Sequence, residues 1–189
     1  DIGNDRDMGI EGIEARAMTE VARYFPEVTE DALEVACVIG DENEVTRLFT
    51  SLIPHLSEQG MDSIMSIAMT QQNEWLLSRL LLELARCIPE SKLHSILLIS
   101  RSIKSEETQI EVLCEFAKRL PNLRKEVVDR INAMSDEVKK AEYLSRLVQH
   151  LQDEELLQVL NMTKAIQFEW ARVKVLSALV MRLPTVSSD

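Results

Sequence analysis

Apolar residues recur in this chain at helical spacing, inside segments that end alike every 31 or 32 residues. The closing residues of these segments lie at positions 26, 57, 89, 121, 152 and 184. A fixed period of this length is typical of a repeat array. The six endings are Val21-Ala22-Arg23-Tyr24-Phe25-Pro26, Leu52-Ile53-Pro54-His55-Leu56-Ser57, Leu84-Ala85-Arg86-Cys87-Ile88-Pro89, Phe116-Ala117-Lys118-Arg119-Leu120-Pro121, Leu147-Val148-Gln149-His150-Leu151-Gln152 and Leu179-Val180-Met181-Arg182-Leu183-Pro184.

A glutamate lies 15 residues before each of these endings. The six glutamates, called the glutamate ladder, are Glu11, Glu42, Glu74, Glu106, Glu137 and Glu169, and four of them follow a capping residue, namely Asp41, Asn73, Ser105 and Asp136. Capping side chains accept hydrogen bonds from the first helical turn, and a carboxylate suits the positive end of a helix. A helix, called the B helix, is therefore predicted to begin at each glutamate and to stop at the closing proline or its replacement.

The apolar residues of the B helices fall into columns at helical spacing. These columns are Leu48, Phe49, Leu52, Leu56; Leu80, Leu81, Leu84, Ile88; Val112, Leu113, Phe116, Leu120; Tyr143, Leu144, Leu147, Leu151; and Val175, Leu176, Leu179, Leu183. A second helix, called the A helix, is predicted between each ending and the next glutamate. Its apolar pairs are Leu33 and Ala36, Ile64 and Ile67, Ile96 and Ile99, Val128 and Ile131, and Val159 and Met162.

The predicted fold class is all-α, with one lone B helix at about residues 11–25 followed by five A–B hairpins. Since no hairpin can bury both of its apolar flanks alone, the hairpins are expected to stack into an α-solenoid. We expect residues 1–189 to form a single helical-repeat domain that is a segment of a longer protein. The last repeat is as apolar as the interior ones, whereas a terminal repeat normally has a polar outer face.

Composition and net charge argue against some classes of partner and location. Lys and Arg number 21 against 32 Asp and Glu, and the resulting net charge of −11 argues against a nucleic-acid partner. No apolar run is long enough to span a bilayer, and no secretory signal opens the sequence. The three cysteines, Cys37, Cys87 and Cys114, lack metal-ligand spacing and lie among apolar helical residues. Reduced thiols in a cytoplasmic protein are therefore expected.

The repeat resembles the helical repeats, about 32 residues long, of the C-terminal arrays in bacterial NACHT or NB-ARC type signalling ATPases. The resemblance rests on Leu84-Ala85 with Ile88-Pro89, Phe116-Ala117 with Leu120-Pro121, Ala165-Ile166 with Glu169, and Ile103 with Glu106. It implies a sensor platform attached to an ATPase; no phosphate-binding glycine loop is present here. The HEAT-like repeats of phycobilin lyases have similar length, but their Asp-Pro and paired-Arg pattern is absent.

The candidate binding surface is the outward side of the B helices, called the B-helix stripe. Its residues are Arg16, Glu20, Arg23; Arg47, Ser51, Pro54; Arg79, Glu83, Arg86; Glu111, Glu115, Lys118; Glu142, Arg146, Gln149; and Lys174, Ala178, Met181. Solenoids commonly bind partners along such surfaces. Arg16, Arg23, Arg47, Arg79 and Arg86 concentrate positive charge in the first repeats. The alternative is a solvated face of mixed charge, held by intrahelical pairs such as Arg79 with Glu83.

Trp75 and Trp170 each follow a ladder glutamate directly. One interpretation is a ring that covers the turn between the two helices of its own hairpin. The other is an exposed anchor for a partner, because aromatic residues often dominate interfaces, and Phe168 lies beside Trp170.

The remaining polar residues indicate no catalytic or metal site. Helix packing places equivalent ladder glutamates about 8–10 Å apart, too far to share one calcium ion. His55 and His150 occupy the same column three repeats apart, and His94 lies on an A helix, so no zinc site is expected. No cofactor is predicted.

The predicted function is therefore a non-catalytic, protein-binding or ligand-sensing module of a larger signalling protein, with a protein partner that carries acidic groups. Two alternatives stay open. One is a HEAT-like lyase or modifying enzyme, which needs a closed polar cavity. The other is a structural spacer that stacks on further copies through its exposed apolar ends.

Overall fold

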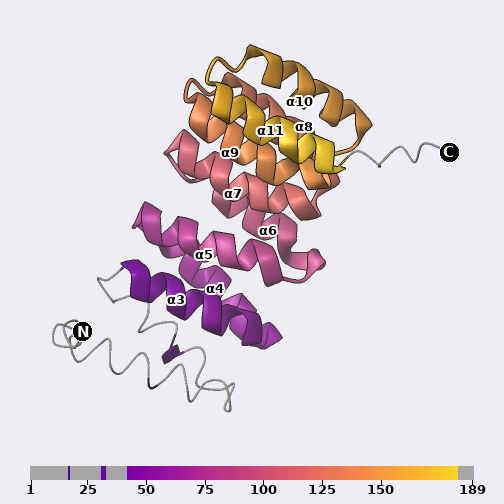
Figure 1. Ribbon diagram of the computed structural model, residues 1–189. Coiled ribbons are helices and arrows are strands. Elements are labelled where there is room, and N and C mark those ends of the chain that lie inside the picture. The colour runs from indigo at the N-terminus through magenta and orange to yellow at the C-terminus, as the bar shows by residue number, and fades with distance from the viewer. Residues whose placement is uncertain (1–16, 18–30, 33–41, 183–189) are drawn as a thin grey trace. The chain divides into compact units, whose positions relative to one another are not determined.

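The computed structural model describes residues 17, 31–32 and 42–182 (Figure 1). The chain divides into two compact units, residues 1–104 and residues 105–189. The lone helix predicted at about residues 11–25 lies outside the described residues, except that Ala17 is helical. The capping residue Asp41 lies outside them as well.

Residues 42–104 of the first unit contain four α-helices and one 3-10 turn. They are α3 (Glu42–Leu52), η2 (Ile53–His55), α4 (Glu58–Thr70), α5 (Glu74–Cys87) and α6 (Glu90–Ser100). The B helices α3 and α5 pack against each other, and so do the A helices α4 and α6. Helix α5 also packs against both A helices. Each helix of this unit therefore contacts its sequence neighbour or the next helix of its own kind.

The second unit repeats this pattern. Its elements are α7 (Glu106–Arg119), α8 (Pro121–Ala133), α9 (Glu137–Leu147), η3 (Val148–His150), α10 (Asp153–Ala165) and α11 (Glu169–Arg182). Helix α7 packs against α8 and α9, α8 packs against α10, and α11 packs against both α9 and α10. No strand occurs among the residues that the structure describes, which confirms the all-α class. None of the described helices is long and apolar enough to cross a bilayer.

The predicted starts of the B helices are confirmed for the five repeats that the structure describes. Helices α3, α5, α7, α9 and α11 begin at their ladder glutamates. Asn73 accepts the backbone N–H of Leu76 at 3.2 Å, and Ser105 accepts that of Thr108 at 3.3 Å. Asp136 accepts two N–H groups of its helix, at 2.9 and 3.0 Å. Side-chain caps thus fix the starts of α5, α7 and α9.

The closing residues Pro89 and Pro121 follow the ends of α5 and α7, as predicted, and they also start the next helix. Pro89 is the N-cap of α6 and Pro121 is the first residue of α8, so both belong to the following A helix. Proline suits the first helical turn because its missing N–H would have no partner there. Ser57, which replaces the closing proline, caps the A helix α4, because its side chain accepts the backbone N–H of Gly60 at 3.0 Å. The closing position therefore starts the next helix as much as it stops the previous one.

The B helices end in two ways. In α5, α7 and α11 the α-helix continues to a basic last turn, with Arg86, Lys118, Arg119 and Arg182 in these turns. In α3 and α9 the helix stops three residues earlier relative to the repeat and tightens into the 3-10 turns η2 and η3. These turns end at His55 and His150. The two histidines of one sequence column therefore share one local geometry.

The apolar columns form the core of each unit. The four column residues of α5, namely Leu80, Leu81, Leu84 and Ile88, are fully buried. Those of α7 and α9 are also buried, while Leu56 after η2 is half-buried and Leu176 of α11 is 37% exposed. The small residues Ala85 and Ala117 are completely buried, as expected for positions where helices approach closely.

Candidate functional site

The arginines predicted to bind a partner share one register position on α3 and α5. Arg47 and Arg79 each lie five residues after the ladder glutamate that starts their helix. Because α3 packs against α5, the two positions lie on neighbouring helices of the first unit. Arg47 is exposed and Arg79 is half-buried. Arg16 and Arg23 lie outside the described residues.

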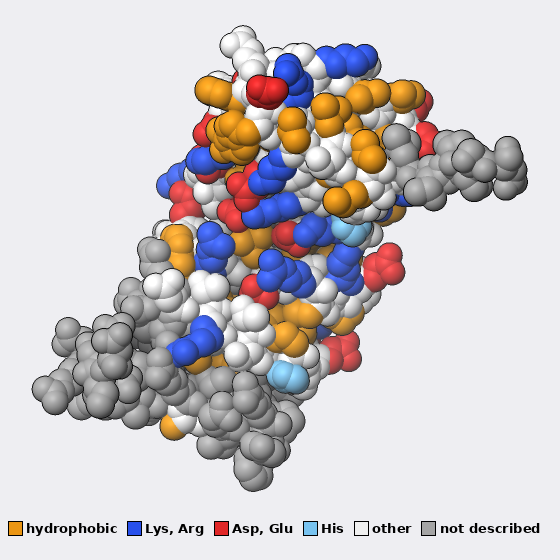
Figure 2. Space-filling view, viewed as in Figure 1, with side chains coloured by type: hydrophobic (Ala, Val, Ile, Leu, Met, Phe, Trp, Pro, Cys, Tyr) orange, Lys and Arg blue, Asp and Glu red, His pale blue; other side chains and the backbone are white. Residues whose placement is uncertain are grey.

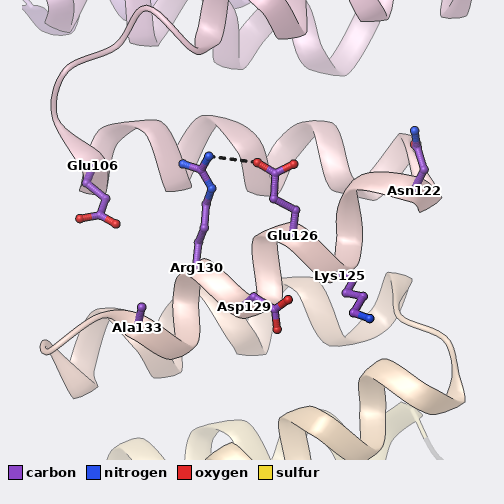
Figure 3. Close-up of a pocket in the computed structure, with 7 residues that line it drawn as sticks. All are labelled: Glu106, Asn122, Lys125, Glu126, Asp129, Arg130 and Ala133. Carbon is purple, nitrogen blue, oxygen red and sulfur yellow. Dashed lines mark ion pairs between the residues drawn. The ribbon is translucent and has the colours of Figure 1, made fainter.

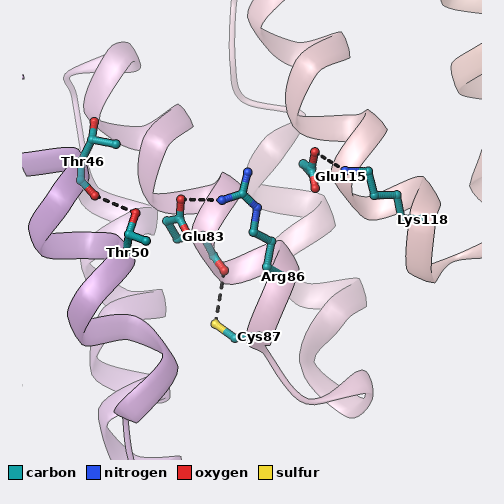
Figure 4. Close-up of polar contacts among 7 residues, drawn as sticks. All are labelled: Thr46, Thr50, Glu83, Arg86, Cys87, Glu115 and Lys118. Atoms are coloured by element: carbon teal, nitrogen blue, oxygen red, sulfur yellow. Dashed lines mark hydrogen bonds and ion pairs between the residues drawn. The ribbon is translucent and has the colours of Figure 1, made fainter. Parts of the chain in front are cut away.

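Arg86 is accessible but held by its own helix. Its Nη1 lies 2.8 Å from Oε1 of Glu83, and the side chains are 54% and 12% exposed respectively (Figure 4). An ion pair between residues three positions apart on a helix contributes about 0.2–0.5 kcal/mol. The pair therefore orients the guanidinium more than it stabilises the fold.

The B-helix stripe of the second unit contains two ion pairs of this kind. Lys118 Nζ lies 2.5 Å from Glu115 Oε1, and Arg146 pairs with Glu142 on α9. Charged side chains of both signs are interspersed on the face shown in Figure 2. These pairs support the alternative of a solvated, mixed-charge face for this unit. Among the described residues, the stripe carries three arginines in the first unit, Arg47, Arg79 and Arg86, and one in the second, Arg146.

The two tryptophans differ although they occupy one register position. Trp75 on α5 is half-buried, which fits a ring that covers its own hairpin. Trp170 on α11 is 55% exposed, and the neighbouring Phe168 is 56% exposed. An exposed aromatic pair at the start of a helix fits the role of an anchor.

The ladder glutamates do more than start helices. A carboxylate oxygen of Glu74 accepts the backbone N–H of Lys104, in the loop after α6. Likewise Oε2 of Glu137 accepts the N–H groups of Gln167 and Phe168, at 2.8 and 3.0 Å. Both loops precede the ladder glutamate of the following repeat. Glu74 and Glu137 thus satisfy loop N–H groups about 30 residues further along the chain.

Metal binding finds no support in the described part of the chain. No group of three or more His, Cys, Asp or Glu residues there could hold a metal ion. His55 and His94 are exposed, on different elements of the first unit, and His150 belongs to the second unit.

A polar hollow lies between the start of α7 and α8, and nothing in the repeat pattern predicted it (Figure 3). Its volume is about 580 Å³. The lining residues are Glu106, Asn122, Lys125, Glu126, Asp129, Arg130 and Ala133. The signal in the sequence is the polar surface of α8, which differs from the more apolar A helices α4 and α6.

Hydrogen bonds already engage several groups of this hollow. Arg130 Nη2 lies 3.0 Å from Glu126 Oε1, and Arg130 Nη1 donates a hydrogen bond to Gln109 Oε1 at 2.5 Å. Asp129 accepts a hydrogen bond from Gln158 Nε2 at 2.6 Å. The lining contains no hydroxyl, thiol or imidazole that could act as a nucleophile. Such an arrangement of charged and amide side chains can bind polar groups.

Two buried groups of the second unit have shifted pKa values. Burial raises the pKa of the Cys114 thiol to about 12, and the neighbouring carboxylate of Glu115 adds to the effect. Burial also raises the pKa of Tyr143 to about 12, with Glu111 and Glu107 contributing. Both groups are therefore neutral near pH 7. A thiol with a raised pKa is a poor nucleophile, so Cys114 is a core residue.

Two partly accessible groups have shifted pKa values, each for a different reason. Burial lowers the pKa of His150, and the cations Lys118 and Arg124 lower it further. The hydrogen bond to Glu107 raises the pKa of Lys139, which spans from α9 to α7.

Comparisons with protein-family models, with curated proteins and with solved structures found no match.

Proposed function

We propose that this chain is an α-solenoid of stacked A–B hairpins that serves as a non-catalytic, protein-binding or ligand-sensing module of a larger cytoplasmic signalling protein. The packing of α3 on α5, and of α7 on α9 on α11, supports the stacked arrangement within each unit. A solenoid presents an extended surface, and such surfaces recognise partners by shape and charge.

The observation that carries the binding proposal is the equivalent placement of Arg47 and Arg79 on neighbouring B helices. Guanidinium groups bind carboxylates as forked donors, which gives both direction and strength to the contact. A protein whose net charge is −11 would otherwise repel acidic partners. Locally concentrated arginines therefore favour a partner that carries acidic groups. Arg86 adds an accessible cation on the same stripe.

Affinity capture from the source lysate tests this proposal, with mass spectrometry as the readout. The parent chain is compared with the Arg47→Glu, Arg79→Glu double variant. The proposal predicts one protein that the parent retains and the variant loses, with capture reduced about tenfold or more.

The matched control reverses two exposed cations off the stripe, as Arg101→Glu with Lys104→Glu. Both residues lie in the same unit, and the change in net charge is identical. The control should capture the partner as the parent does. Equal losses in both double variants would mean that only overall charge matters, and the stripe would lose its assignment.

A further inference from the structure

Three register positions distinguish the last helix from the B helices before it. They lie four, seven and eleven residues after the ladder glutamate and are buried in α7 and α9. The buried residues are Ile110, Leu113 and Ala117 in α7, and Ala141, Leu144 and Val148 from α9 through η3. In α11 the same positions hold Val173, Leu176 and Val180, which are 52%, 37% and 68% exposed. An apolar stripe of α11 is therefore uncovered.

The packing order of the second unit explains this difference. Helix α9 packs against α7, and α11 packs against α9 and η3. The face that α7 and α9 bury is thus turned toward the next B helix in each case. The uncovered stripe of α11 continues an interface that the unit has already formed twice. Trp170 and Phe168 extend it at the start of the helix.

A polar contact accompanies the packing of α11 on α9. Glu137 accepts the N–H groups of Gln167 and Phe168, the two residues before Glu169. Glu169 occupies the equivalent place on α11 and is exposed. Among the described residues it has no corresponding loop to bind. Its carboxylate is therefore placed to accept two backbone N–H groups from an incoming loop.

The neighbouring A helix completes the surface. An apolar hollow of about 290 Å³ lies between α10 and α11, lined by Asp153, Leu156, Leu157, Leu160 and Leu179. Leu157 is 63% exposed. Hydrophobic side chains gather over α10 and α11 in the face shown in Figure 2. The packing of α10 on α8 shows that an A helix takes another A helix as its neighbour.

We propose that the faces of α10 and α11 form a docking surface for one further helical hairpin of this repeat type. The hairpin sits on α10 and α11 as these helices sit on α8 and α9. Its first helix fills the hollow beside Leu157, and its second helix covers Val173, Leu176 and Val180. The loop between its helices gives two backbone N–H groups to Glu169. The partner is thus recognised by an apolar stripe and a loop in fixed register.

An extended chain tests the proposal. Residues 1–184 are followed by a second copy of residues 153–182, because Pro184 occupies the repeat position that Gln152 has before α10. The copy carries the inner faces that already pack on α8 and α9. We expect the extension to raise the melting temperature by at least about 4 °C.

Matched variants show whether the copy lies on the proposed face. Val180→Lys should change the melting temperature little in the parent chain, but it should remove most of the gain in the extended chain. Met181→Lys is the control, because Met181 is 81% exposed and lies beside the stripe. It should act alike in both chains. Glu169→Gln should remove a smaller part of the gain.

Two results would overturn the proposal. An extension that leaves the melting temperature unchanged, or a gain that Val180→Lys does not reduce, would mean that a hairpin does not dock on this face. Sedimentation of the parent chain tests whether a second copy of this chain binds to the face instead. A concentration-dependent dimer that Val180→Lys abolishes would assign the face to a second copy of this chain instead.

Discussion

Leu144 and Leu176 occupy the same register position, seven residues after Glu137 and Glu169, yet Leu144 is fully buried and Leu176 is 37% exposed. The difference comes from the neighbouring helix, because α11 packs against α9. The residue type and the repeat position are identical in the two cases. Burial in this fold is therefore decided by what lies next in the stack.

Truncation of these two leucines should have unequal effects. Leu144→Ala leaves a cavity in a packed interface and should lower the free energy of unfolding by about 2–5 kcal/mol. Leu176→Ala should cost clearly less, because part of its side chain is already in water. Urea denaturation followed by circular dichroism measures both. Equal losses would contradict the assignment of this column to contacts with the next helix.

The ladder glutamates should also differ in their contribution. Glu137→Ala removes the acceptor of two backbone N–H groups and should destabilise the fold by about 1 kcal/mol. Glu169→Ala is the matched control, since Glu169 also starts a B helix but has no such loop contact among the described residues. Its effect should stay within a few tenths of a kcal/mol. If the two variants are destabilised equally, the interaction with the helix dipole alone accounts for the contribution of the ladder glutamates to stability.

Thiol labelling should separate Cys87 from Cys114. At pH 8 a thiol with a pKa of about 12 is deprotonated in roughly one molecule in 10⁴, and the Cys114 side chain is also buried. Cys87 is half-buried, with its Sγ 3.2 Å from the Glu83 carbonyl oxygen. Iodoacetamide should modify Cys87 well before Cys114, as read by peptide mass spectrometry. In denaturing urea the two rates should converge, and faster labelling of Cys114 in the folded chain would contradict its buried placement.

Acidification should destabilise the second unit through His150. Its pKa in the folded state lies below the ordinary value of 6.5, so the unfolded chain binds the proton more readily. The associated stability is complete above pH 6.5 and is lost as the pH falls from there toward the folded pKa. His150→Gln should make the fall in unfolding free energy between about pH 7 and 5 shallower.

The matched control is His55→Gln, because His55 ends the equivalent 3-10 turn but is exposed. Stability is measured by urea denaturation at several pH values. If His55→Gln makes the pH dependence of stability shallower and His150→Gln does not, burial beside Lys118 and Arg124 does not govern this pH dependence.

The repeat pattern predicted the local structure well. Asn73, Ser105 and Asp136 identified helix starts because a capping side chain acts within its own turn. The closing prolines were harder to interpret, since a proline both ends one helix and begins another. Pro89 and Pro121 proved to belong to the A helices. Whether a proline lies after one helix or inside the start of the next depends on the number of residues that connect the two helices. The residue type alone does not determine that number.

Features that depend on neighbouring helices could not be derived in the same way. The hollow lined by Lys125 and Arg130 results from the packing of α7 beside α8. The exposure of Val180 results from the absence of a covering helix among the described residues. The hydrogen bonds of Glu137 join residues about 30 positions apart. A periodic sequence specifies each repeat, but contacts between repeats depend on how the repeats stack.

The binding proposal is tested most directly by a photoreactive amino acid placed at Thr50. This residue is exposed on α3 and lies three positions after Arg47. Irradiation in the source lysate should give one discrete cross-linked protein, and Arg47→Glu with Arg79→Glu should abolish it. The same probe at Ser95, exposed on α6, should give no such adduct. A common adduct from both positions, or none from Thr50, would contradict a partner-binding surface on the B helices.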